Sequence, residues 1–254
     1  MVLVSPFRAL RPPPSLAAAV ASLPYDVMDV AEARAMADGD DVSFLHVTRP
    51  EIDLPDDVDP DDDLVHAQGR AALDAMREAG VLELDAAPTM SVYRQRRGDH
   101  VQTGLVLLAS VDDYESGAVA KHELTRPDKE LDRVRHLAAL GVQDEPVFLL
   151  GSRHADIDAV VAAVVAGDPD IDVVTDDGIG HTLWVLDDVD AIARVVAGFA
   201  GLPRLYIADG HHRSAAAARL RELRRREGLA PSALPGDGLG HDGFLAVVFP
   251  ADEL

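Results

Sequence analysis

The side chains with the clearest potential for chemistry lie in one short segment. Residues 206–213 have the sequence Tyr-Ile-Ala-Asp-Gly-His-His-Arg and are followed by Ser-Ala-Ala-Ala-Ala. This pattern predicts a short buried strand, a tight turn at Gly210 and the first turn of a helix. The first N–H groups of a helix are unpaired and lie at the positive end of its dipole, so they favour an anion. We therefore expect a phosphate-binding turn whose ionisable side chains are Asp209, His211, His212 and Arg213.

Each residue type in this turn offers a defined contribution. Gly210 lets the backbone approach a ligand closely, and the fork of Arg213 suits a phosphate. A histidine exchanges a proton near neutral pH, and Asp209 is able to hold Mg²⁺ or accept a proton. The alternative is a plain Asp-Gly turn with a polar helix start. We favour phosphate binding and expect Arg213→Ala to lose phosphate affinity with little change in stability.

A second candidate segment contains both lysines of the chain. Of the 23 basic residues, only Lys121 and Lys129 are lysines, and His122 and Glu123 lie between them. Lysine is a compact charge with a tunable pKa, whereas arginine is a fixed planar fork, so this segment is a candidate for needing an ammonium group. The alternative is chance clustering in a lysine-poor chain. Glu123 is a candidate general base for a hydroxyl group.

Weaker candidates for substrate binding occur at the edges of other predicted elements. They are Tyr25, Asp26, Arg49, Glu51 and Thr125. Turn structure, and a simple ion pair between Arg49 and Glu51, explain most of them equally well. Asp132 and His136 share a helical face, and we expect them to form ion pairs on an exposed surface.

Composition excludes several classes of function. The formal net charge of −22 disfavours contact with nucleic acid phosphates. The chain has no cysteine, so disulfides and thiolate chemistry are absent. We find neither a signal-peptide pattern nor an apolar run long enough for a bilayer, which predicts a cytoplasmic protein with no membrane contact.

Hydrophobic periodicity predicts helices and strands that alternate along the chain. The expected helices cover residues 30–38 (capped by Asp29 and Glu32), 62–79, 125–140 (with Thr125 and Asp128 as a capping box), 156–166, 188–199 and 214–227. The expected strands cover residues 43–48, 90–95, 101–111, 117–121, 147–150, 171–175, 181–186, 205–208 and 244–249. We expect Trp184 in the core and a hairpin turn at residues 97–99.

These elements predict an α/β to α+β fold, with mixed sheets and flanking helices. The expected organisation is an N-terminal α+β region, 1–145, and a C-terminal α/β region, 146–254, which could pack as one unit. A Gly- and Pro-rich loop at 228–243 is expected to cover a pocket. Because a core strand lies so near the last residue, we also expect that a C-terminal portion is missing.

Five motifs occur in an order that resembles a known family. They are Pro-Tyr-Asp-Val at 24–27, Phe-Leu-His-Val with Arg-Pro-Glu at 44–51, Tyr-Arg-Gln with Gln-Thr-Gly at 93–104, Lys-His-Glu at 121–123 with Thr125, Lys129, Asp132 and Arg133, and the turn at 206–213. Over nearly its whole length the chain is similar to the domain of unknown function 1015 family of bacteria and archaea. Members of that family are often labelled ParB-like.

More distantly, the segment 205–227 resembles the strand–turn–helix of the ParB and sulfiredoxin superfamily, which includes ParB-like free serine kinases. That resemblance implies that Gly210 to Arg213 hold a nucleotide and that Glu123 or Asp209 activates a hydroxyl acceptor. The cysteine of sulfiredoxin is replaced by histidine, so its redox chemistry is not implied. The helix-turn-helix of ParB is not evident.

The leading hypothesis is a nucleotide-binding phosphotransferase, or nucleotide hydrolase, acting on a small hydroxyl metabolite such as a serine-like compound. Mg²⁺ and a nucleoside triphosphate or diphosphate are the expected cofactors, with Asp209 as the metal ligand. Phosphate binding is assigned to residues 210–213 with Lys121 and Lys129, and acid–base chemistry to His122, Glu123, Asp209 and His211.

One alternative is a non-catalytic, nucleotide-responsive regulatory module. The other is a metal-dependent hydrolase using His122, His211 and Asp209. The sequence leaves the donor, the acceptor and the oligomeric state open.

Overall fold

A mixed β-sheet forms the centre of the computed structural model, which describes residues 1–60, 62–123, 125–175, 177–228 and 242–254. Within these residues the sheet has nine strands in the order β6-β10-β7-β11-β5-β4-β9-β8, and β1 pairs with the end of β5 beyond β4. The strands are β1 (Val4–Ser5), β4 (Met90–Arg97), β5 (His100–Ser110), β6 (Val119–Ala120), β7 (Val147–Gly151), β8 (Ile171–Val174), β9 (Gly180–Leu186), β10 (Leu205–Asp209) and β11 (Gly243–Pro250). The pairs β6–β10 and β7–β11 are parallel, and the other pairs are antiparallel.

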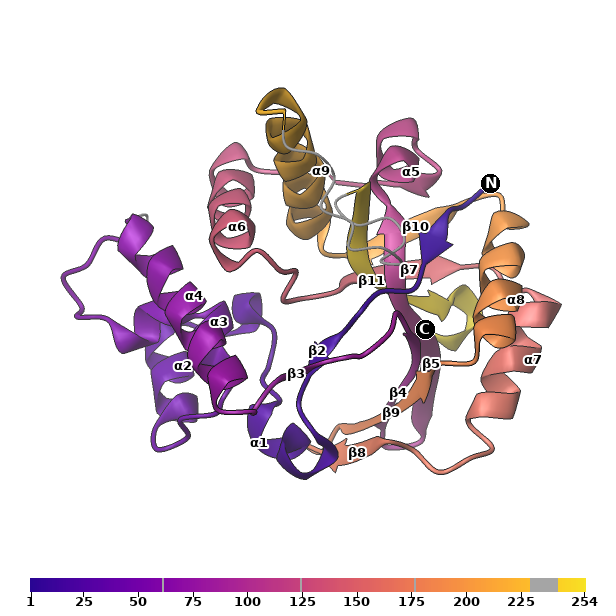
Figure 1. Cartoon of the computed structure of the whole chain (residues 1–254), viewed down its shortest axis with the longest axis horizontal. Helices are drawn as coiled ribbons and strands as arrows, with labels where there is room; N and C mark the ends of the chain where they lie inside the picture. Colours follow the sequence, from indigo (N-terminus) through magenta and orange to yellow (C-terminus); the bar gives the residue numbers. More distant parts are fainter. Residues whose placement is uncertain (61, 124, 176, 229–241) are drawn as a thin grey trace.

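Helices lie on both sides of this sheet (Figure 1). They are α1 (Ala17–Val20), α2 (Val30–Ala37), α3 (Leu45–Thr48), α4 (Asp63–Glu78), α5 (Val111–Ser116), α6 (Pro127–Leu140), α7 (Ala155–Val164), α8 (Val189–Ala200) and α9 (His211–Arg226). The helices α7 and α8 lie on one side, and α1 to α4, α6 and α9 lie on the other. A small sheet of β2 (Leu10–Arg11) and β3 (Glu83–Leu84) joins the N-terminal helices to the sheet. The expected mixed α/β fold with flanking helices is therefore confirmed.

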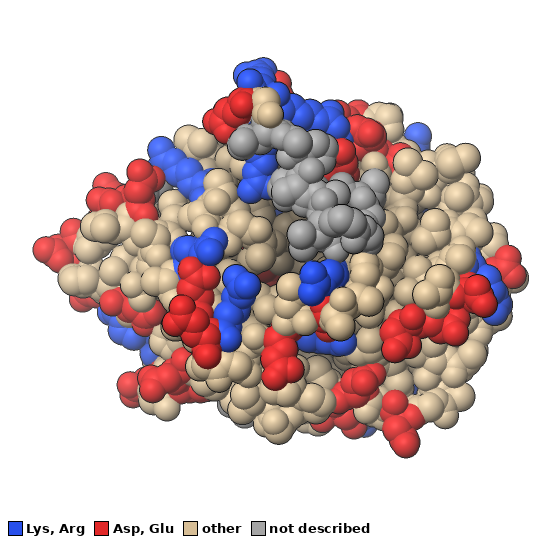
Figure 2. Space-filling model, viewed as in Figure 1, with Lys and Arg blue, Asp and Glu red and all other residues tan. Residues whose placement is uncertain are grey.

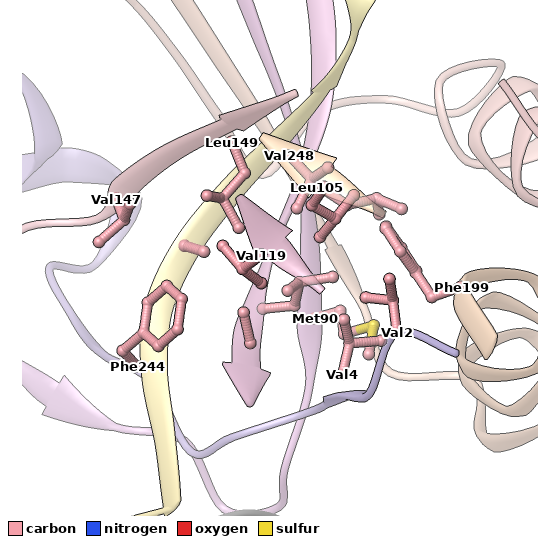
Figure 3. Close-up of a cluster of buried hydrophobic side chains, with 14 of the residues drawn as sticks. Val2, Val4, Met90, Leu105, Val119, Val147, Leu149, Phe199, Phe244 and Val248 are labelled. Atoms are coloured by element: carbon pink, nitrogen blue, oxygen red, sulfur yellow. The ribbon is translucent and has the colours of Figure 1, made fainter. Parts of the chain in front are cut away.

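Alternation along the strands separates the two faces of the sheet. Leu105, Met90, Leu149 and Val248 belong to the main buried cluster, which includes Phe199 of α8 (Figure 3). Their sequence neighbours point to the opposite face, as the period of two in a strand requires. We call this opposite face the cavity face, because it borders the cavity described below.

Several local predictions are confirmed. Asp29 and Glu32 form a complete capping box on α2. The two-residue turn between β4 and β5 has Gly98 at a φ of 61°, and a glycine with positive φ as the first central residue is typical of a type II′ hairpin. Trp184 is buried in the main cluster.

Two local predictions were wrong. Residues 45–48 form the helix α3 instead of a strand, held by local bonds such as Arg49 N–H to the Leu45 carbonyl. A short apolar run does not distinguish a buried strand from a buried helical turn. The helix α9 begins at His211, three residues before the predicted start, so the polar residues of the turn form its first turn.

Strands from both predicted regions share the central sheet. The strand β11 lies between β5 and β7, and β4 lies between β5 and β9. Residues 1–145 and 146–254 therefore contribute to one layer. The loop expected to cover a pocket lies mostly outside the described residues.

Candidate functional site

The turn between β10 and α9 has the backbone geometry of an anion site. Gly210 has a φ of 92°, in the left-handed region that favours glycine, and directly precedes the first residue of α9. In the described part of the chain, no acceptor is paired with the N–H groups of His211, His212 and Arg213, whereas Ser214 N–H already bonds to the Gly210 carbonyl. Three donors at the positive end of the helix dipole thus remain available to a ligand.

The Lys-His-Glu loop packs directly on this turn. His122 donates its backbone N–H to Nε2 of His211 at 3.5 Å, and the two imidazole rings lie edge to face with centroids 4.4 Å apart. Arg126 donates its backbone N–H to Nε2 of His212 at 3.2 Å. Both histidines of the turn therefore accept at Nε2 and carry their proton at Nδ1. Burial, and then the neighbouring His122, lower the pKa of His211, so this ring is neutral near pH 7.

The other predicted residues, Lys121, Glu123 and Lys129, have different contacts and different exposure. Lys121 lies 3.6 Å from the centroid of the Tyr114 ring, a cation–π contact that fixes the start of the loop. Glu123 is exposed and lies 3.9 Å from Nε2 of His122. Lys129 is exposed in the first turn of α6.

The predicted capping box at Thr125 was wrong. The N-cap residue of α6 is Arg126, which makes no side-chain cap, and Pro127 occupies the first turn. The Thr125 hydroxyl instead donates to Oε2 of Glu130 at 2.8 Å. This bond fixes the end of the loop and leaves the hydroxyl oxygen only as an acceptor.

Arg213 is engaged by the protein itself. Its side chain is only 14% exposed, and Nη2 lies 2.9 Å from Oδ2 of Asp209. Nε lies 3.3 Å from Oε2 of Glu145, and Nη1 donates to the Pro146 carbonyl. All three nitrogens of the guanidinium that we expected to bind a phosphate thus contact internal partners. In this arrangement Arg213 positions the carboxylates beside the turn.

Glu145 is the functional candidate that the sequence analysis missed. Burial raises the pKa of its carboxyl from 4.5 to about 7, against the opposing effect of Arg213, and Asp144 adds to the rise. Its Oε1 accepts the backbone N–H of Tyr25 at 3.0 Å. A carboxyl group with a pKa near neutrality, beside an open turn, is suited to proton transfer. Its only sequence signal is an acidic pair directly before Pro146 and a buried strand.

The weaker motifs surround the same group. Asp26 lies 3.7 Å from Nη2 of Arg213, and Arg133 lies over the ring of Tyr25, 4.1 Å from its centroid. Arg49 pairs with Glu51 at 2.7 Å and donates from Nη1 to the carbonyls of Tyr25 and Met28. Arg49, itself paired with Glu51, therefore holds the backbone of the Tyr25 segment in place.

Asp132 and His136 do form polar contacts, but the prediction that they lie on an exposed surface was wrong. His136 is buried and bonds through Nε2 to Oδ2 of Asp144 at 3.0 Å. Asp132 is half-buried, pairs with Arg133 at 2.9 Å and lies 3.8 Å from Nε2 of His66. This network lies on the side of α6 that packs against the neighbouring helices, because α6 contacts both α4 and α9.

A large cavity opens beside the turn, on the cavity face of the sheet. Its volume is about 690 Å³, and its walls are mostly apolar. At one end it is lined by Asp209, Arg213 and Glu145, and at the other by Tyr93 and His181. The histidines of the turn and the Lys-His-Glu loop are not among its lining residues, so the anion position and the cavity lie on two sides of one turn.

The described residues contain no group of three or more His, Asp or Glu side chains arranged to hold a metal ion. His122, His211 and Asp209 therefore do not form a ready ligand set. Asp209 is 61% exposed, and one of its two oxygens is bonded to Arg213. A metal at this position would need most of its ligands from a bound substrate and water.

Replacing Gly210 with alanine is expected to lower the free energy of unfolding by about 2 to 3 kcal/mol. A Cβ atom there would lie 3.2 Å from Cα of Val147, and the positive φ adds strain. Gly80→Ala is the control, because Gly80 has a φ of 71° with nothing within 4 Å. It is expected to cost about 1 kcal/mol. Equal losses in urea unfolding would show that Gly210 is not packed as described.

Comparison with known proteins gives one match, to a family model. Neither the curated proteins nor the solved structures contain a match to this chain. No helix of the described segments has the length and apolar character needed to cross a bilayer. The matching family model is described as "Protein of unknown function (DUF1015)" and covers residues 4–254, so the chain belongs to this family.

Proposed function

We propose that this chain is a nucleotide-binding phosphotransferase that transfers a phosphoryl group to a small hydroxyl compound, with hydrolysis of the nucleotide as the variant in which water is the acceptor. The observation that carries the proposal is the packing of the Lys-His-Glu loop on the open N-terminus of α9. Segments from five parts of the sequence meet there, at residues 25–26, 49–51, 121–126, 145 and 209–213. Of these residues, Glu145, Asp209 and Arg213 also line one end of the cavity.

The phosphate groups would bind on the loop side of the turn. The N–H groups of residues 211–213 supply oriented donors, and the Nδ1–H groups of His211 and His212 supply others. Lys121 and the exposed His122 lie on the same side and add positive charge and a further donor. Phosphoryl transfer depends chiefly on such positioning and charge stabilisation.

The acceptor hydroxyl would lie near Glu145 and Asp209, at the edge of the turn that the terminal phosphate would reach from the loop side. In the transfer step a new P–O bond forms to the hydroxyl oxygen, and the P–O bond to the leaving phosphate breaks. The hydroxyl proton passes to the carboxylate of Glu145, whose raised pKa of about 7 suits a group that takes up and returns a proton. Glu123 is the alternative base, although its exposure and distance from the cavity make it less suitable.

Mg²⁺ fits this site as an ion that arrives with the nucleotide. Mg²⁺ is commonly bound by one or two carboxylates together with substrate phosphates. Asp209, at the end of β10 and directly before the turn, is the carboxylate placed for this role. When bound, the ion would neutralise phosphate charge.

Three further proposals follow from the same features. The strand–turn–helix of β10 and α9 supports a distant likeness to the ParB and sulfiredoxin superfamily. Acidic and basic side chains are interspersed on the face shown in Figure 2, and with the net charge of −22 this supports a small-molecule ligand over nucleic acid. A cytoplasmic location is consistent with a nucleotide substrate.

Nucleotide affinity tests the proposal. In thermal-shift and calorimetric titrations with ATP, ADP, GTP and CTP, each with Mg²⁺, at least one nucleotide should bind. The double variant Lys121→Ala/His122→Ala should bind it about tenfold more weakly or worse, because contacts to charged groups are lost. The control is His100→Ala in the exposed hairpin, with unchanged affinity expected. No binding by any nucleotide, or equal loss in the control, would contradict the proposal.

Turnover separates the enzyme from the non-catalytic alternative. Glu145→Gln should retain nucleotide binding and lose most transfer to a panel of hydroxyl metabolites, measured as phosphorylated product and as free phosphate. Nucleotide binding with no product from the unmodified chain would favour a regulatory module.

A further inference from the structure

A row of aromatic rings leads across the cavity away from the turn. Tyr93 on β4, Phe249 on β11 and Phe148 on β7 all line the cavity. The ring centroids of Tyr93 and Phe249 are 6.3 Å apart, and those of Phe249 and Phe148 are 5.0 Å apart. Such a row offers apolar surface to a flat ring, which can pack against it face or edge on.

At the Tyr93 end of this row, a chain of hydrogen bonds runs from Tyr93 through His181 to Thr175. The partners in this chain determine which atom carries each proton. The Thr175 hydroxyl has one proton, which it donates to Oδ1 of Asp177 at 2.6 Å or to the Ile179 carbonyl at 3.1 Å. Thr175 therefore accepts from Nε2–H of His181 at 3.3 Å, which leaves Nδ1 of His181 as an acceptor. The Tyr93 hydroxyl must then donate to that Nδ1, at 2.6 Å.

The consequence is a hydrogen-bond acceptor in an apolar wall. The proton of Tyr93 is committed to His181, so its phenol oxygen can only accept, from the neighbouring Gln95 side chain or from a ligand. Burial raises the pKa of Tyr93 to about 12 and lowers the pKa of His181, so both groups are neutral near pH 7. Asp177, a charged residue that lines the cavity next to Thr175 and Ile179, is already bonded to the Thr175 hydroxyl and to the Ile179 N–H. An ionised ligand group would therefore be left unpaired there, at a large desolvation cost.

We propose that this cavity is a second binding site, for an uncharged small molecule with a flat apolar body and a hydroxyl or amide N–H directed at the Tyr93 oxygen. The site lies at the opposite end of the cavity from Glu145 and Arg213. It requires neither a nucleotide nor a reaction, so it stands or fails independently of the proposed phosphoryl transfer.

The probes are 2-naphthol, which can donate a hydrogen bond, and 2-methoxynaphthalene, its methyl ether, which cannot. Equilibrium titration of the full chain, followed by probe fluorescence without nucleotide, should show saturable binding of both. Preference for 2-naphthol should be about three- to tenfold, the effect of one hydrogen bond. Tyr93→Phe should abolish this preference while it keeps the affinity for the ether.

A matched pair on the edge strand β8 tests the location. Val173 lines the cavity and pairs in register with His181, whereas Val174 is 64% exposed. Val173→Trp should fill the cavity and weaken both probes more than tenfold, and Val174→Trp should change neither affinity. Failure of the unmodified chain to bind either probe, or undiminished binding by folded Val173→Trp, would overturn the proposal. Persistence of the preference in Tyr93→Phe would overturn the assigned role of the phenol oxygen. Should Val173→Trp fail to fold, the Tyr93→Phe comparison still decides.

Discussion

Arg213→Gln is expected to lower the free energy of unfolding by about 3 to 5 kcal/mol at pH 8. The guanidinium is the nearest counter-charge to the buried carboxyl of Glu145, and it also bonds to Asp209 and the Pro146 carbonyl. Removing one partner of a buried ion pair leaves the other charge without compensation. The measurement belongs at pH 8, because below about pH 7 Glu145 takes up a proton and avoids part of this cost.

Arg219→Gln is the matched control for this substitution. Arg219 lies on the same helix and also pairs with a glutamate, Glu130, at 3.4 Å, but its side chain is 54% exposed. Arg219→Gln should lower the free energy of unfolding, measured in urea, by about 0 to 1 kcal/mol. The contradicting result is an Arg213→Gln variant that is as stable as the unmodified chain and loses only nucleotide affinity. That result would show that the guanidinium binds the phosphate directly.

The second large effect is a loss of stability with rising pH that originates at Glu145. Its folded-state pKa of about 7 lies above the ordinary value of 4.5, so between these values the folded chain holds a proton that the unfolded chain has released. Its contribution is therefore fully present below pH 4.5 and is lost as the pH rises through 7. The total loss is about 3 kcal/mol, from about 1.4 kcal/mol for each pKa unit.

Glu145→Gln isolates this contribution from that of the other carboxyl groups. Asp144, whose pKa is lowered by its hydrogen bond to His136 against the effect of burial, acts in the opposite direction and remains in both proteins. The difference in unfolding free energy between Glu145→Gln and the unmodified chain should shift in favour of the variant by about 3 kcal/mol from pH 4.5 to pH 8. A difference that stays constant over this range would show that the carboxyl is not desolvated as described.

The fold was predictable where each element carries its own signal. Asp29 with Glu32, and Gly98 in its turn, fix a helix start and a hairpin through bonds to near neighbours in the sequence. The alternation around Trp184 identifies the buried face without knowledge of the partner strand. Residues 45–48 carry no such signal, because their apolar side chains would be buried equally well in a strand or in a helical turn.

The candidate site was predictable only in part, because only some of its residues are positioned by near neighbours in the sequence. The turn at 209–213 has a local pattern, and its glycine is where that pattern places it, although the helix begins three residues earlier than predicted. The phosphate contact expected for Arg213 stays a prediction. Its local pattern could not show that the side chain is engaged by Glu145, 68 positions earlier in the sequence numbering, and by Asp26. Whether a guanidinium faces a ligand or a carboxylate is decided by tertiary packing.

The central claim is that the open N-terminus of α9 binds the phosphate groups of a nucleotide. The most direct measurement is an NMR titration of the ¹⁵N-labelled chain with Mg²⁺ and the nucleotide that binds best. The N–H signals of His211, His212 and Arg213 should move together and saturate, with smaller changes at Lys121 and His122. Saturable binding that leaves these N–H signals unmoved would contradict the claim.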